Sequence, residues 1–224
     1  MGEYFDWVNV DKKEYLCPAD FDLGNKRTES CWRGASLLNA LYELLSSDWK
    51  GDHIVFLGDY ALIPEDSQNA TLKKLYLHTV QNGDPSIGQD SVYELYRNVS
   101  CLFHEAEPIV REAIGYYIED IENGICDNVN EYKIDLACPY SGLFLREGRA
   151  FPYVVNHTKK VYYGFDQTIM LDEDGTPVPW KDPLPSLMVF SGNVPPGKWL
   201  GDVIGVAETV PDGYELLETI RIED

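Results

Sequence analysis

The first residues that could do chemistry are Cys31 and Trp32, which come just before an apolar stripe with helical spacing. Thr28 or Ser30 can cap a helix at this point, so the pattern predicts that Cys31 lies at the helix start. Unpaired backbone N–H groups and the helix dipole lower the pKa of a thiol at such a position. Cys31 is therefore a candidate nucleophile, and His157 is the downstream histidine that could act as its base.

Cys-Trp at a helix start resembles the nucleophile segment of the papain-like cysteine proteases. The resemblance covers two residues and implies a hydrolase that uses Cys31 and His157. That family also carries an upstream glutamine for its oxyanion hole, but residues 20–30, DFDLGNKRTES, contain none. His157 moreover falls in a predicted hairpin turn, where a side chain is exposed to solvent. We therefore favour a structural or incidental role for Cys31 and assign no catalytic residue.

Residues 53–59, HIVFLGD, resemble the strand-then-Gly-Asp step of the calcineurin-like metallophosphoesterases, where a carboxylate at a strand end bridges two metals. The resemblance implies a metal-dependent hydrolase that uses Asp59. The D-x-H and G-N-H-[D/E] segments of that family are absent from this sequence, and the four histidines lack zinc-binding spacing. We expect a buried strand that ends in a turn, with no metal and no other cofactor.

A third group of candidates is acidic. Glu105, Glu112, Glu119 and Glu122 lie at heptad-like spacing on a predicted helix, opposite its isoleucines. The chain has 38 acidic and 18 basic residues, which gives a formal charge of −20. Such a field repels nucleic acids and anionic lipids and attracts basic proteins. The sequence therefore predicts no direct nucleic-acid binding, and the helix face is either simply solvated or a contact surface for a basic protein partner.

Trp180 and Trp199 form the last group, because they lie in or beside the proline-rich segments PVPWKDPLP and NVPPGKW. Proline is excluded from central strands, so both segments are predicted to be surface loops. Exposed tryptophans are rigid anchors in protein interfaces. The alternative is that both rings attach these loops to the core.

The elements that must position these residues begin with two hairpins. The pattern V-N-x-[D/T]-K-K-x-Y occurs at Val8 and again at Val155, and each copy is flanked by aromatic and β-branched residues. It predicts hairpins over residues 4–21 and 151–165. The neighbouring residues differ, so we attribute the recurrence to shared turn chemistry and not to a duplicated domain.

The rest of the chain reads as a single α+β domain, residues 1–224, with an N-terminal hairpin, a helical middle section and a mostly antiparallel C-terminal sheet. One helix is predicted to begin near Cys31 and to end near residues 46–48. Three others are predicted over residues 70–80, 90–100 and 107–122. Strands are predicted over 53–57, 132–136, 143–146, 151–155, 161–165, 168–171, 202–207 and 214–222.

Location follows from what the sequence lacks. No basic or apolar leader precedes residue 10, and no apolar run approaches the roughly 20 residues that span a bilayer. The five cysteines, an odd number without a C-x-x-C pair, indicate reduced thiols. We therefore expect a cytoplasmic protein that does not bind membranes.

These observations lead to the hypothesis of a non-catalytic acidic interaction protein. It would bind or inhibit, stoichiometrically, a basic protein that itself acts on nucleic acid, as a bacterial immunity protein does. Two alternatives stay open: a cysteine- or metal-dependent hydrolase that uses Cys31 or Asp59, and a subunit of a larger assembly. Neither the oligomeric state nor the identity of the partner follows from the sequence.

Overall fold

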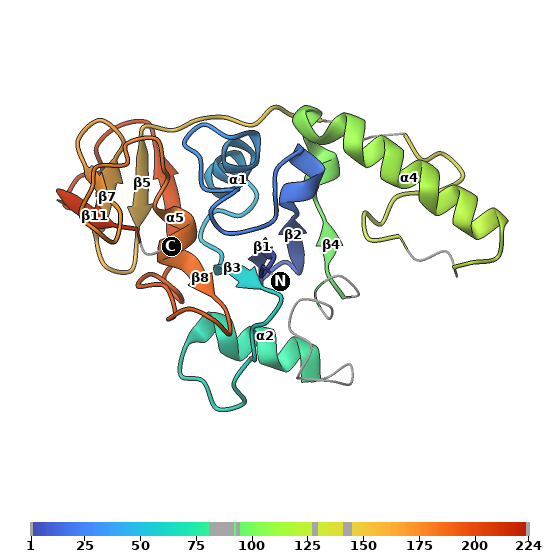
Figure 1. Cartoon of the computed structure of the whole chain (residues 1–224), viewed down its shortest axis with the longest axis horizontal. Helices are drawn as coiled ribbons and strands as arrows, with labels where there is room; N and C mark the ends of the chain where they lie inside the picture. The colour runs from blue at the N-terminus through green and yellow to red at the C-terminus, as the bar shows by residue number, and fades with distance from the viewer. Residues whose placement is uncertain (1, 81–91, 93–94, 127–129, 141–144, 223–224) are drawn as a thin grey trace.

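The computed structural model describes residues 2–80, 92, 95–126, 130–140 and 145–222. It confirms the α+β class, with an N-terminal hairpin, helices in the middle and a second sheet in the C-terminal part (Figure 1). In the described part of the chain, no helix is both long and apolar enough to cross a bilayer.

The first sheet contains five strands in the order β4-β2-β1-β3-β8. Its central strand, β1, is buried at every position because its two neighbours and the helices cover it. β1 is antiparallel to both neighbours, whereas β4 and β8 add in parallel at the two edges. The strands are β1 (Phe5–Asn9), β2 (Glu14–Leu16), β3 (Ile54–Gly58), β4 (Arg97–Asn98) and β8 (Val189–Phe190).

The second sheet contains four strands in the order β10-β6-β5-β9, and β7 and β11 form a separate parallel pair. Within the four-stranded sheet β5 is antiparallel to β6 and β9, and β10 is parallel to β6. The strands are β5 (Tyr153–Asn156), β6 (Val161–Gly164), β7 (Ile169–Leu171), β9 (Ile204–Ala207), β10 (Glu215–Leu216) and β11 (Thr219–Arg221).

The α-helices whose bounds the structure describes are α1 (Ser36–Ser46), α2 (Ala70–Val80), α4 (Glu107–Glu122) and α5 (Leu184–Met188). α1 is apolar on most of its surface and lies in the main core, as its leucine pattern predicts. Its predicted start is wrong, because the helix begins at Ser36 and the preceding residues form turns and a strand bridge. Short 3₁₀ turns cover Pro18–Phe21, Ser100–Leu102 and His104–Ala106.

Two further predictions need correction. Residues 132–136 form turns and irregular chain instead of a strand. The predicted helix over 90–100 does not reach its end, because β4 and a 3₁₀ turn occupy residues 97–102. Most of the beginning of that helix, and residues 143–144 of another predicted strand, lie outside the described residues.

The likeness between the two hairpins extends far beyond their turns. Asn9 pairs with Glu14 in β2 and with Ile54 in β3, and Asn156 holds the same place between β6 and β9. β4 adds in parallel to β2, as β10 does to β6. The strand orders β4-β2-β1-β3 and β10-β6-β5-β9 are therefore equivalent, strand by strand and with the same directions.

Each half also contains the same polar contact, which we call the clasp. In a clasp, an asparagine at the strand end and a lysine in the turn both contact the aspartate of a Trp-x-Gly-Asp segment. The first clasp consists of Asn9, Lys12 and residues 49–52. The second consists of Asn156, Lys159 and residues 199–202. Asn9 donates to Asp52 at 2.9 Å, and Asn156 donates to Asp202 at 2.7 Å. The hypothesis that the recurrence ends at the turn is therefore wrong, because the fold itself is repeated.

The two halves are related by a pseudo-twofold axis. His53 and Val203, which each follow the clasp aspartate, pair with one another in an antiparallel bridge. Such pairing of equivalent positions is the property of a twofold interface. The helices are exchanged accordingly, since α1 packs against β9 and α5 packs against β3. The main core contains side chains from both halves.

Candidate functional site

Cys31 lies five residues before α1, so it is not at a helix start. Its side chain is buried, with 3% exposed, and its thiol donates to the Thr28 carbonyl at 3.3 Å. Its backbone carbonyl accepts a hydrogen bond from the Asp182 amide. These contacts describe a core cysteine, and Cys31 does not lie at the start of α1, where the expected activation by the helix dipole would act.

His157 lies on the exposed tip of the second hairpin, as its sequence context predicts. Its Nδ1 lies 2.9 Å from the Tyr214 hydroxyl, and the two rings meet edge to face. Burial of part of the ring, together with the charges of Lys160 and Lys50, lowers the pKa of His157. The partners of His157 and of Cys31 are thus different, and their geometry gives no support to a thiol–imidazole pair.

Asp59 follows β3 and accepts a hydrogen bond from the Tyr4 amide at 3.0 Å. It therefore links the end of β3 to the residue that precedes β1. Among the residues that the structure describes, no three His, Cys, Asp or Glu side chains are grouped as a metal site requires.

We expect alkylation of the native protein by iodoacetamide to distinguish its cysteines. Cys138 is exposed and should react rapidly, whereas Cys31 and Cys101 are buried and should react only after denaturant is added. Mass spectrometry of peptides after timed labelling measures both rates. Native labelling of Cys31 as fast as that of Cys138 would restore the nucleophile hypothesis.

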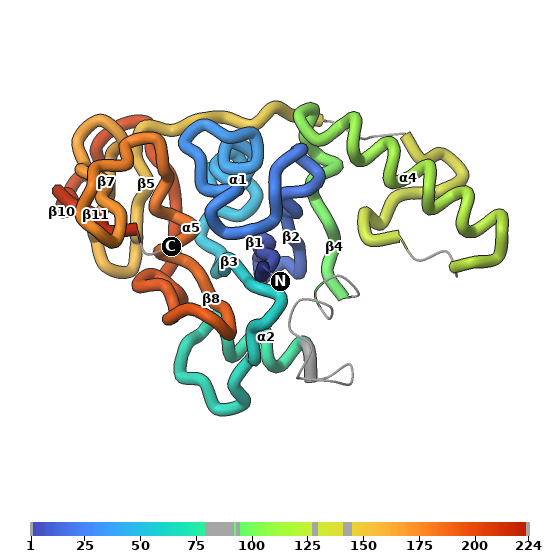
Figure 2. The backbone as a smooth tube through the Cα atoms, in the orientation of Figure 1, coloured from blue at the N-terminus to red at the C-terminus, as the bar shows by residue number. Residues whose placement is uncertain are grey.

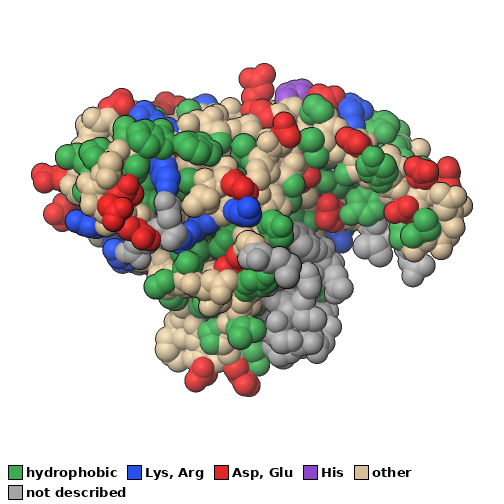
Figure 3. All heavy atoms as spheres, viewed as in Figure 1, with side chains coloured by type: hydrophobic (Ala, Val, Ile, Leu, Met, Phe, Trp, Pro, Cys, Tyr) green, Lys and Arg blue, Asp and Glu red, His purple; other side chains and the backbone are tan. Residues whose placement is uncertain are grey.

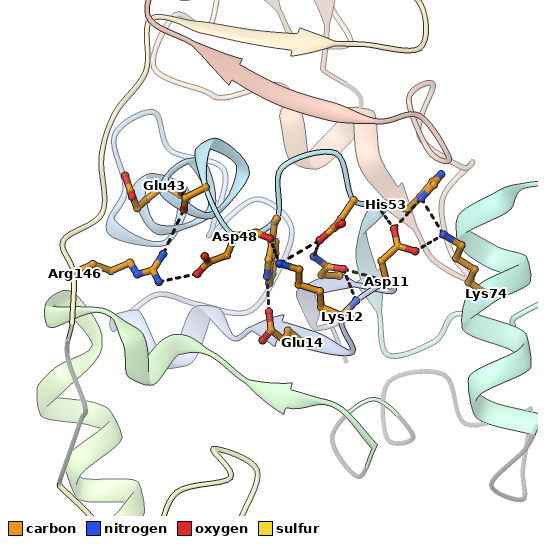
Figure 4. Close-up of polar contacts among 12 residues, drawn as sticks. Asp11, Lys12, Glu14, Glu43, Asp48, His53, Lys74 and Arg146 are labelled. Carbon is orange, nitrogen blue, oxygen red and sulfur yellow. Dashed lines mark hydrogen bonds and ion pairs between the residues drawn. The ribbon is translucent and has the colours of Figure 1, made fainter.

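The hairpin turn of the first half carries a charged cluster that the second half lacks. Asp11 lies between His53 and Lys74, and accepts from the His53 amide at 2.7 Å (Figure 4). Burial raises the pKa of Asp11, but the hydrogen bonds from Lys74 and His53 outweigh it and hold the pKa below its usual value. In the second half the Thr158 hydroxyl accepts the equivalent hydrogen bond from the Val203 amide at 2.9 Å, without any charge. The ion pair between Asp11 and Lys74 links α2 to the hairpin.

α4 carries several exposed acidic side chains. It extends from the sheets to one end of the molecule (Figures 1 and 2), and only Val110 and Ile114 are fully buried along it. Glu112, Glu119 and Glu122 are exposed, as is Tyr116, whose hydroxyl donates to Glu112 at 3.0 Å. We call these four residues the acidic arm. Acidic side chains are visible around this end of the molecule in Figure 3.

Glu105 does not belong to this surface. It is half-buried, and one of its carboxylate oxygens accepts from the Gly148 amide at 2.7 Å. Gly148 belongs to the segment that crosses over α1 toward the second sheet, and it packs against the backbone of Asn39 and Ala40. Glu105 therefore fastens this crossing segment.

The two tryptophans predicted to be anchors have different surroundings. Trp180 is 51% exposed, whereas Trp199 is 4% exposed and its ring lies 5.8 Å from that of Tyr163. Trp199 belongs to the second clasp, so its side chain packs into the core. Trp32, which is 46% exposed, was not predicted as an anchor, and its bridge with Lys181 brings it beside Trp180. Only this long-range pairing, which one sequence does not reveal, could have identified it.

The buried polar residues are a structural group. Asp182 is fully buried and accepts hydrogen bonds from Tyr163 at 2.8 Å, from the Leu184 amide at 3.0 Å and from Tyr42. Burial raises the pKa of this carboxyl, although the hydrogen bonds oppose the shift. Tyr42 belongs to α1 and Tyr163 to β6, so Asp182 connects the two halves.

No family model matches the chain, and no curated protein and no solved structure is significantly similar to it.

Proposed function

We propose that the protein is a non-catalytic, stoichiometric binder of a basic protein, and that the acidic arm is its contact surface. The observation that carries the proposal is the stripe of Glu112, Tyr116 and Glu119, which lie on one face of a helix that extends away from the core. Residues at i, i+4 and i+7 share a helix face, so a partner can contact all three at once.

The chemistry of this surface suits a partner rich in lysine and arginine. α4 carries Glu107, Glu112, Glu119, Asp120 and Glu122 against a single base, and that base, Arg111, is paired with Glu107 at 2.9 Å. Complementary charge accelerates encounter, and a tyrosine contributes rigid contact area. If the partner acts on nucleic acid, the glutamates would cover the cations that it needs for its own substrate. Binding would then inhibit it, as an immunity protein inhibits its toxin.

A cytoplasmic location fits the proposal. The five cysteines are free, and Cys138 is exposed at the surface. An exposed free thiol persists in a reducing compartment.

Neutralisation of the arm tests the proposal. The triple variant Glu112→Gln, Glu119→Gln, Glu122→Gln should bind the partner about 10- to 100-fold more weakly, because it loses three complementary charges. The basic partner is first captured from the native host with wild-type protein, and its Kd is then measured by calorimetry at several salt concentrations. For wild-type protein we expect the Kd to rise with ionic strength.

The matched control removes the same charge from other exposed positions, with Asp66→Asn, Asp174→Asn and Glu218→Gln. We expect it to bind like wild type. Equal loss of affinity in both triple variants would show that the overall charge, and not the arm, attracts the partner. No loss in either variant would refute the role of the arm.

A further inference from the structure

A cavity of about 400 Å³ lies beside α5, and its charge is opposite to that of the whole chain. Three basic side chains line it, Arg27, Lys198 and Arg221, against one acidic side chain, Glu173. The chain as a whole carries more than two acids for each base. Figure 3 shows basic side chains near one another around β7, β11 and α5, next to acidic ones. A local excess of positive charge in such a chain calls for an explanation.

Several of the parts that build this cavity are additions to the repeated fold. In the first half the clasp tryptophan follows α1 after two residues, whereas residues 189–198 separate α5 from Trp199. This added segment contributes Val189, Val194 and Lys198 to the cavity wall. Arg221 belongs to β11, which pairs with β7 outside the two equivalent sheets. The clasp of the first half forms without any of these parts, although β8, at the start of the added segment, pairs with β3 at the edge of the first sheet.

Hydrogen bonds hold two of the basic residues, Lys198 and Arg221. The Lys198 carbonyl accepts from the clasp lysine, Lys159, at 2.6 Å. Arg221 donates from its guanidinium to the Glu173 carbonyl at 3.4 Å. Arg27 forms no ion pair with any residue that the structure describes, so its charge has no acidic partner there. A guanidinium of this kind presents several N–H donors in a planar array.

We propose that this cavity binds a small organic anion, with a phosphate or two carboxylates on an apolar body. The two arginines match phosphate and carboxylate oxygens, which guanidinium groups bind in bidentate fashion. Leu187, Val189 and Val194 offer apolar wall for the rest of the molecule. The volume is in the range of sites for small ligands, roughly 300–1,000 Å³. This site is separate from the acidic arm and does not depend on the function proposed for it.

Calorimetric titration of the full chain at low ionic strength tests the proposal with three probes. Phenyl phosphate and benzene-1,3-dicarboxylate distinguish the two anionic groups, and inorganic phosphate lacks the apolar body. We expect one of the aromatic anions to bind more tightly than inorganic phosphate. Arg27→Gln and Arg221→Gln should each weaken that binding about tenfold or more, because each removes a charge-assisted hydrogen bond.

Lys73→Gln is the matched control, since Lys73 is exposed on α2 and does not line the cavity. It should bind the probes like wild type. Circular dichroism of each variant verifies that it is folded, which is expected because neither arginine is buried. Absence of binding at millimolar concentrations of all three probes would overturn the proposal. Equal binding by wild type, both arginine variants and the control would also overturn it, because the anions would then bind elsewhere.

Discussion

Asp182→Ala is expected to lower the free energy of unfolding by about 3–5 kcal/mol. The substitution leaves the hydroxyls of Tyr42 and Tyr163 and the Leu184 amide without their acceptor in a fully buried place. An unsatisfied buried donor costs about 1–3 kcal/mol, so three of them account for the size of the effect. Urea denaturation followed by circular dichroism measures it. Asp66→Ala, at an exposed position, should change stability by less than about 0.5 kcal/mol.

The cost of Asp182→Ala should also depend on pH. Burial raises the pKa of Asp182 above its ordinary value of 3.8, so the folded state holds this proton more tightly than the unfolded chain does. The stability that results is complete below the unfolded pKa and is lost as pH rises through the folded pKa. Alanine removes this linkage, so its cost should decrease as pH rises from the unfolded value of 3.8 through the raised pKa of the folded state. A cost that increases with pH would show instead that the folded pKa is lowered.

Trp199→Ala is expected to lower the free energy of unfolding by about 3–5 kcal/mol, because it leaves a cavity in the core. Trp199 is 4% exposed and packs against Tyr163 behind the second clasp. Thermal and urea unfolding measure the loss. Trp180→Ala is the matched control, since 51% of that residue is exposed, and it should cost far less. Similar costs for the two substitutions would contradict the difference in packing.

The sequence predicts those elements whose determinants are local. The turns of both hairpins are predicted correctly because asparagine and lysine act there within a few residues: the Asn9 side chain accepts from the Lys12 amide, as Asn156 accepts from that of Lys159. The predicted end of the first hairpin at residue 21 is wrong, because its second strand ends at Leu16 and a 3₁₀ turn follows. α4 is also predicted correctly, because Pro108 in its first turn and Asn123-Gly124 at its end are local signals.

The errors arise where distant segments meet. The expected helix start at Cys31 fails because Trp32 pairs with Lys181, far along the chain. Trp199 was predicted to lie on the surface because the prolines of NVPPGKW indicate a loop. Its ring instead packs into the core beside the second clasp. Glu105 has the spacing of a solvated face, yet it fastens Gly148.

The repeated fold could have been found in the sequence from a second shared segment. Trp-x-Gly-Asp follows the hairpin asparagine in both halves, and the clasp spans 43 residues in one half and 46 in the other. Between these segments the apolar residues differ, because any aromatic or branched side chain of suitable size fills the core. The two polar segments are alike because their hydrogen bonds require particular atoms.

The exchange of helices has a consequence for how the chain acquires its structure. α5 packs on β3, and α1 packs on β9. The apolar surface of each half therefore stays partly exposed until the other half has been synthesised and has folded. A nascent chain that ends before β5 would therefore expose this surface at the ribosome. Folding and unfolding should each occur as one cooperative transition, and the two halves should not melt separately.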